Sequence, residues 1–185
     1  MLGARTAALA TAVVATLGSG LMATPADAAT TYVGKVDARG GLKAHFVPAS
    51  GTPTIDSFAN GSRIRLVCKV RSVEVKGNDL WYRVKARGQK WVSAKYVDNV
   101  GRAPRLCGEP TRTTGKVTTD TLNRREAPLL RADKEGRLHR GDRVTAVCWI
   151  NGMQNNQSDK AWYQLGNGTW VSARYLDAPG SPYCA

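Results

Sequence analysis

The stretch Trp91–Asp98 reads Trp-Val-Ser-Ala-Lys-Tyr-Val-Asp, and Trp170–Asp177 repeats it as Trp-Val-Ser-Ala-Arg-Tyr-Leu-Asp. Each copy follows a Trp-Tyr pair and precedes one cysteine, Cys107 in the first case and Cys184 in the second. Aromatic, apolar and cysteine positions that recur together mark an internal repeat. The sequence therefore predicts two related units in tandem.

The repeat extends well beyond this stretch. The first copy opens at Gly34-Lys35-Val36 and the second at Gly115-Lys116-Val117. The spacing between the copies is then constant from Leu42 and Leu122 to the first cysteine of each copy. It changes slightly before the Trp-Tyr pair and again before the repeated stretch, which locates the loops that vary.

Residues 1–28 are predicted to be a secretory signal peptide. Arg5 supplies the positive start, Ala7 to Leu17 form a short apolar run, and Ala26-Asp27-Ala28 is a cleavage site of the small-x-small type. A membrane anchor is the alternative, but the run is broken by Gly18-Ser19-Gly20 and is shorter than the roughly 20 residues a spanning helix needs. No other segment is long enough to cross a bilayer. We expect a secreted protein, extracellular or associated with the cell wall.

Four cysteines remain in the mature chain, and they allow three disulfide connectivities. The repeat favours Cys68–Cys107 with Cys148–Cys184, because each unit then carries the same internal bond. Each bond would stabilise a small unit by about 4 kcal/mol in the chain-entropy model. A zinc site with His45 or His139 is the competing interpretation. It lacks the C-x-x-C spacing, and export favours oxidation, so we expect no metal and no cofactor.

The local patterns are those of β-strands. Short, partly alternating runs rich in β-branched or aromatic residues recur in both copies, and no window shows a sustained helical period. In the run Trp81–Val84, alternation places Tyr82 and Val84 on one face and Trp81 and Arg83 on the other. The prediction is an all-β fold of two small, partly open barrels: a first domain at 29–107, a linker at 108–114 and a second domain at 115–185.

Both copies resemble bacterial SH3 domains, the secreted or wall-associated relatives of SH3 barrels. The second copy carries the resemblance in Leu122–Pro128 (Leu-Asn-Arg-Arg-Glu-Ala-Pro), Gly136–Gly141, the Trp162-Tyr163 pair and Trp170–Leu176. The first copy fits best in Trp91–Val97. There are departures: Arg124 stands where the family usually has an apolar residue, and Lys90 or Thr169 replaces the glycine before the second tryptophan. The resemblance implies two tandem SH3-like barrels.

The resemblance also implies a ligand groove beside the loops of each barrel. Carried over by position, its residues are Trp81, Ser93 and Tyr96 in the first copy and Trp162, Ser172 and Tyr175 in the second. In SH3 domains that bind proline-rich peptides a proline occupies the serine position, so polyproline recognition is not expected. The aromatic residues of the groove could equally be core residues, and the sequence leaves both possibilities open.

Catalysis has little support in the sequence. It contains no G-x-S-x-G, HExxH, P-loop or dinucleotide-binding motif. The recurrence of Ser93 and Ser172 fits a structural turn better than a nucleophile, because nothing places a base beside them. Bacterial SH3 domains often accompany a wall hydrolase domain, but here the second copy runs to Ala185. We therefore expect a binding protein without catalytic residues.

The net charge of +13 predicts anionic partners. For a secreted chain these would be wall polymers or phospholipid surfaces, and no motif supports specific recognition of nucleic acid. A basic surface that only keeps the protein soluble is the alternative. We expect a non-catalytic protein that binds peptidoglycan or another anionic cell-wall polymer. The other possibilities are an interaction or inhibitor module acting on a secreted enzyme, and a wall hydrolase without recognisable motifs.

Overall fold

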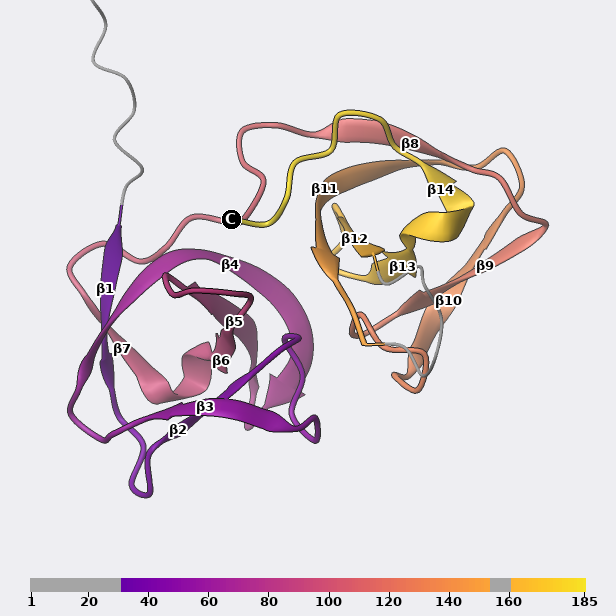
Figure 1. Cartoon of the computed structure of the whole chain (residues 1–185). Coiled ribbons are helices and arrows are strands. Elements are labelled where there is room, and N and C mark those ends of the chain that lie inside the picture. The colour runs from indigo at the N-terminus through magenta and orange to yellow at the C-terminus, as the bar shows by residue number, and fades with distance from the viewer. Residues whose placement is uncertain (1–30, 154–160) are drawn as a thin grey trace, which may run out of the picture.

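The computed structural model describes residues 31–153 and 161–185, and the predicted signal peptide lies outside them. The described chain is all-β and contains two seven-stranded antiparallel sheets (Figure 1). The first sheet has the order β3-β2-β6-β5-β4-β1-β7. Its strands are β1 (Tyr32–Val36), β2 (Leu42–His45), β3 (Thr54–Phe58), β4 (Arg63–Val75), β5 (Asn78–Val84), β6 (Trp91–Ser93) and β7 (Val97–Val100).

The second sheet has the equivalent order, β10-β9-β13-β12-β11-β8-β14. Its strands are β8 (Thr113–Val117), β9 (Thr121–Arg125), β10 (Lys134–His139), β11 (Arg143–Asn151), β12 (Ala161–Leu165), β13 (Trp170–Ser172) and β14 (Leu176–Asp177). Each strand of one sheet thus has a counterpart in the other, so the sequence repeat is also a structural repeat. Strand β8 begins inside the segment predicted as a linker (108–114).

Helical structure in the described residues is confined to two short 3₁₀ turns, η1 (Ala94–Tyr96) and η2 (Ala173–Tyr175). Each follows the second-last strand of its sheet in sequence order, β6 or β13, and lies in the repeated stretch. No helix among the described residues is long and apolar enough to cross a membrane.

Successive side chains of a strand point to opposite faces of the sheet, and in β5 the two faces belong to two different hydrophobic cores. Tyr82 and Val84 point into the core of the first sheet, and Trp81 lies on the opposite face. The faces predicted for these residues are therefore correct. The second sheet has its own core, formed by the buried residues Val117, Leu122, Ala146, Leu165, Val171, Leu176 and Ala178.

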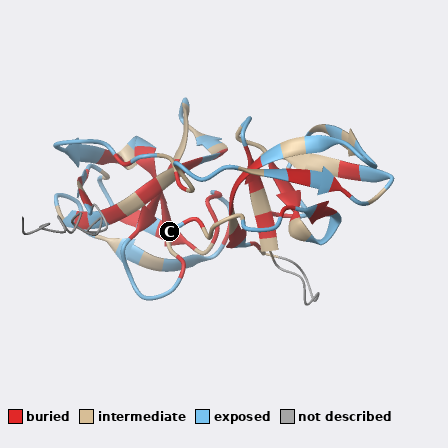
Figure 2. Cartoon of the chain, turned by 90° about the horizontal axis from the view of Figure 1, so that it is seen from above, coloured by how far each residue is buried: buried red, intermediate tan, exposed pale blue. Residues whose placement is uncertain are grey.

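A further core lies between the two sheets and is shared by both repeats. It contains four tryptophans that are at most 1% exposed, together with three aliphatic side chains and the four cysteines. Strands β5 and β12 consequently contribute side chains to two cores, that of their own sheet and the shared one. Figure 2 shows buried residues in both halves of the chain. The two repeats therefore pack as one body. Apart from the cysteines, the buried members of this shared core are Val70, Trp81, Trp91, Val147, Ile150, Trp162 and Trp170.

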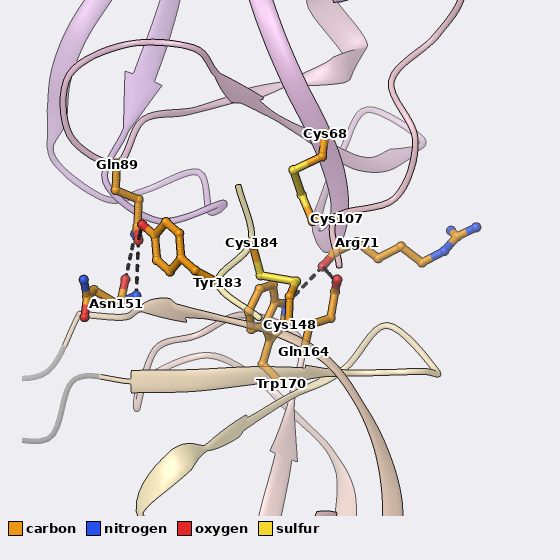
Figure 3. The surroundings of a disulfide bond; sticks show 10 residues. All are labelled: Cys68, Arg71, Gln89, Cys107, Cys148, Asn151, Gln164, Trp170, Tyr183 and Cys184. Atoms are coloured by element: carbon orange, nitrogen blue, oxygen red, sulfur yellow. Dashed lines mark hydrogen bonds between the residues drawn. A yellow bond between two sulfur atoms is a disulfide. The ribbon is translucent and has the colours of Figure 1, made fainter. Parts of the chain in front are cut away.

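The disulfides are Cys68–Cys107 and Cys148–Cys184, with Cα atoms 4.9 and 5.1 Å apart. The pairing favoured by the repeat is thus confirmed. Each bond links the segment that follows the last strand of a sheet to the longest strand of that sheet, β4 or β11. All four cysteines are at most 1% exposed and lie in the shared core (Figure 3). The two bonds therefore hold the faces through which the repeats meet.

Gln89 of the first repeat forms hydrogen bonds within its own repeat, to Phe46, and across to the second repeat, to Asn151 and Tyr183. Its side-chain amide donates to the carbonyl oxygens of Phe46 (2.6 Å) and Asn151 (2.7 Å). Its amide oxygen accepts from the Asn151 N–H (3.2 Å) and the Tyr183 hydroxyl (2.7 Å), as Figure 3 shows. Gln89 is only 6% exposed, although its place in a polar hairpin turn predicts a surface residue.

On the other side of the interface the carbonyl oxygen of Arg71 accepts from Gln164 (2.8 Å) and from the Trp170 indole (2.9 Å). Arg71 and Asn151 occupy equivalent positions in the two repeats, so each repeat offers the same carbonyl to the other. A small buried cluster adds equivalent pairs, Val47 with Ala127 and Ala49 with Leu129. The repeats thus face each other about an approximate two-fold axis, as two subunits of a homodimer would.

Candidate ligand grooves

The three groove residues predicted in the first repeat come together in the structure. Trp81 on β5, Ser93 at the end of β6 and Tyr96 in η1 line one pocket of about 430 Å³. The pocket is also lined by the turn from Ala38 to Gly41, which connects β1 and β2, and by Leu42 and Lys43 at the start of β2. A pocket of this size is in the range of small-molecule and peptide side-chain sites.

The serine of the repeated stretch shapes this groove locally. The Ser93 hydroxyl oxygen accepts a hydrogen bond from the Lys95 N–H (3.2 Å) and caps η1. The cap fixes the tight turn that presents Tyr96, which is half-buried, to the pocket. A short polar side chain that accepts from the backbone two residues later is a common way to start such a turn. The structural role expected for Ser93 is therefore the one observed.

Trp81 contributes only an edge to the groove. It is 1% exposed, and its indole N–H donates to the Val73 carbonyl oxygen (2.8 Å). His45 packs edge-on against it, with ring centroids 5.9 Å apart. The sequence left open whether the aromatic groove residues are buried in a core or exposed to a ligand. In the structure Trp81 and Trp162 are buried, whereas Tyr175 is 40% exposed.

The electrostatic character of the first groove is positive. Arg39 and Lys43 are exposed at its rim, and the described residues that line it include no carboxylate. Lys76 lies with its ammonium 6.0 Å from the centre of the Tyr96 ring. These features would favour a ligand that carries a carboxylate or phosphate beside an apolar part.

His45 adds polarity to the groove rather than charge. Burial lowers the pKa of its imidazole. Hydrogen bonds with the backbone of Thr52 and Pro53 oppose this in part, and repulsion from Lys43 is the smallest effect, which lowers the pKa. Its Nδ1 lies 3.1 Å from the Thr52 carbonyl oxygen and 3.0 Å from the Thr52 hydroxyl. The imidazole is therefore neutral at pH 7, and the positive charge of the groove comes from Arg39 and Lys43.

The second groove is much smaller. Trp162, Ser172 and Tyr175 also line one pocket, but its volume is about 100 Å³. Larger side chains narrow it, because Arg125 stands at the position of His45 and Leu130 at that of Ser50. The Arg125 guanidinium is held by the Ala132 carbonyl oxygen (2.8 Å). The two repeats thus share a fold but not the same groove.

The described residues offer no obvious catalytic or metal-binding arrangement. No group of three or more His, Cys, Asp or Glu side chains among them could hold a metal ion. Ser93 and His45 line the same pocket, but within the described chain the serine hydroxyl bonds to Lys95 and the imidazole to Thr52. No hydrogen bond joins the two side chains there.

Sequence reasoning missed the charged rim and the asymmetry of the grooves. Arg39, Lys43 and His45 lie in the most divergent part of the first repeat, where the family pattern gives no guide. The reduced second groove could have been found by comparing the copies, since the exchange of Ser50 for Leu130 is visible in the sequence.

Comparisons with known proteins identify no family. No family model matches the chain, and no curated protein matches it. Among solved structures, NlpC2 from Trichomonas vaginalis has 12% identity and a TM-score of 0.30, with 80% of this chain and 48% of that chain covered. NlpC1 from the same organism has 9% identity and a TM-score of 0.28, with 82% and 47% covered. This chain spans about half the length of both proteins, and a likeness of this extent carries no argument about function.

Proposed function

We propose that this is a secreted, non-catalytic binding protein of two SH3-like barrels of the bacterial type. Its first groove binds peptidoglycan or another anionic cell-wall polymer. One observation carries the proposal: Trp81, Ser93 and Tyr96, which the family resemblance selects, line one pocket of about 430 Å³.

The chemistry of the groove supports an anionic ligand. Peptide stems of peptidoglycan end in carboxylates, and wall polymers carry carboxylates or phosphates. Arg39 and Lys43 offer the complementary charge, and Tyr96 offers an aromatic face. The net charge of +13 would add long-range attraction to a polyanionic wall. The disulfides, seen in both repeats, are the kind of bond that persists outside the cytoplasm.

The groove is tested by sedimentation of the protein with purified bacterial sacculi over a salt series. We expect Tyr96→Ala to weaken retention at least about fivefold, because truncating an aromatic anchor in a pocket typically costs more than about 1 kcal/mol. Tyr175→Ala is the matched control, since it removes the same residue of the repeated stretch beside the smaller groove. It should leave retention within twofold of the wild type.

Several results would contradict the proposal. Wild-type protein that is not retained at low salt has no wall affinity, and equal losses in both tyrosine variants would remove the groove from the explanation. A soluble complex with an enzyme from culture medium, without sacculus binding, would favour an inhibitor or interaction module. Release of soluble muropeptides would show a hydrolase. Trp81 is unsuitable for this test because its side chain lies in the shared core.

A further inference from the structure

The second repeat contains a pocket that is separate from both grooves. It has a volume of about 420 Å³, and it shares no lining residue with either of them. Its apolar side is formed by side chains that also pack in the core of the second sheet. Its lining includes Arg112, Arg124, Leu138, Val144 and Leu165.

The core next to this pocket differs between the two repeats. In the first sheet Tyr32 on β1 is paired in register with Leu66 on β4, and both are buried in the core. The same register position in the second sheet pairs Thr113 with Ala146. Two large core side chains are thus replaced by two small ones. Protein interiors are close-packed, so such an exchange leaves room unless another side chain fills it.

A half-buried arginine, Arg124, lines this pocket. Arg124 pairs in register with Gly136, where the first repeat pairs Ala44 with Asp56. Ala44 is fully buried in its core, so Arg124 stands at the position of a core residue of the first repeat. A Cβ atom at position 136 would collide with the Arg124 guanidinium, so the glycine makes the space that this side chain occupies.

The Arg124 side chain is incompletely satisfied. Its Nε is buried without a hydrogen-bond partner, and none of the described carboxylates forms an ion pair with its guanidinium. Arg112, at the same pocket, has Glu109 at 3.6 Å. A guanidinium placed against apolar side chains is costly unless an anion completes its hydrogen bonds.

We propose that this pocket binds a small organic anion, a carboxylate or phosphate carried on a short apolar group. Arg124 would hold the anion in the two-pronged geometry that guanidinium and oxyanion groups share. Arg112 adds a second positive charge at the same pocket. The apolar part of the ligand packs on Leu138, Val144 and Leu165.

Calorimetric titration of the full chain with four probes tests this site. Phenyl phosphate and phenylacetate each combine an anion with an apolar ring, whereas inorganic phosphate lacks the ring and benzyl alcohol lacks the charge. At least one of the two ring anions should bind with a dissociation constant below about 1 mM, and the two partial probes at least tenfold more weakly. The tighter of the two ring anions identifies the anionic group.

Two variants locate the binding. Arg124→Ala, which installs the residue of the first repeat, should weaken binding of the ring anion at least tenfold. Arg143→Ala, which removes an exposed arginine at the start of β11, is the control and should bind as the wild type does.

The proposal is overturned if neither ring anion binds, or if Arg124→Ala binds as tightly as the wild type. Inorganic phosphate that binds as tightly as the ring anions would also contradict the proposal, because it would indicate an unspecific basic surface. Benzyl alcohol that binds as tightly would contradict it as well, because it would indicate a purely apolar cavity. Sacculus retention of Arg124→Ala should be unchanged, because the pocket shares no residue with the first groove. Failure of this site would therefore be distinguishable from failure of the proposed wall binding.

Discussion

Replacing Trp170 by alanine is expected to lower the free energy of unfolding by about 3–5 kcal/mol, the usual cost of truncating a large aromatic core residue. Trp170 is fully buried in the core shared by the repeats. Its indole N–H also donates to the Arg71 carbonyl oxygen of the other repeat. The substitution therefore removes packing and a hydrogen bond from the interface at once. Chemical denaturation followed by tryptophan fluorescence or circular dichroism measures the effect.

The equivalent tryptophan provides a matched control. Trp91 is as buried as Trp170, but its indole N–H has no hydrogen-bond partner among the described residues. Phenylalanine at either position keeps most of the buried ring. Trp170→Phe should therefore cost about 1 kcal/mol more than Trp91→Phe, which is the typical net value of one hydrogen bond. Equal costs would show that the bond to Arg71 contributes nothing. A cost of Trp170→Ala below about 0.5 kcal/mol, as for a surface site, would contradict the shared core.

Removing both disulfides should be more damaging still. Each closes a segment with a sequence separation of 39 or 36 residues. The chain-entropy model gives about 4 kcal/mol for a loop of this length, so loss of both approaches the total stability of a typical small protein, about 5–15 kcal/mol. We expect the reduced chain to be largely unfolded at 37 °C. Thermal unfolding by circular dichroism, with and without a phosphine reductant, measures this.

The approximate two-fold arrangement supplies a control for the disulfide experiment. Cys68→Ala/Cys107→Ala and Cys148→Ala/Cys184→Ala open loops of similar length on equivalent faces of the shared core. The two double variants should therefore lose similar stability. A reduced protein that melts within a few degrees of the oxidised one would show that the bonds are dispensable for the fold.

The sequence was sufficient for much of the fold because the repeat and the strand alternation are local signals. The alternation of Trp81 and Tyr82 assigned each to its correct face, and the repeat selected the correct disulfide pairing. It was not sufficient to show what covers the Trp81 face. A strand with large apolar residues on both faces indicates burial on both sides. Only the arrangement in space shows that the second layer is the other repeat.

The candidate site was predictable in part for similar reasons. The family resemblance brought Trp81, Ser93 and Tyr96 to one pocket, because these positions follow from the strand order. Whether a pocket is open depends on single side chains around it, such as Leu130 in the second repeat. The bonds of Gln89 across the interface likewise depend on how the repeats meet. Neither the opening of a pocket nor a contact across the interface can be predicted from the local periodicity of the sequence.

Whether the Tyr96 groove is the ligand site is tested most directly by an NMR titration of the isotope-labelled protein with soluble peptidoglycan fragments. Saturable shift changes are expected at the backbone amides of Ser93 and Tyr96 and along Ala38–Lys43, which line the groove, and at Lys95, whose N–H donates to the Ser93 hydroxyl oxygen. The amide of Tyr175 in the second repeat should not shift. Shifts centred on Tyr175, or no shift at Tyr96 at saturating fragment concentration, would contradict this assignment.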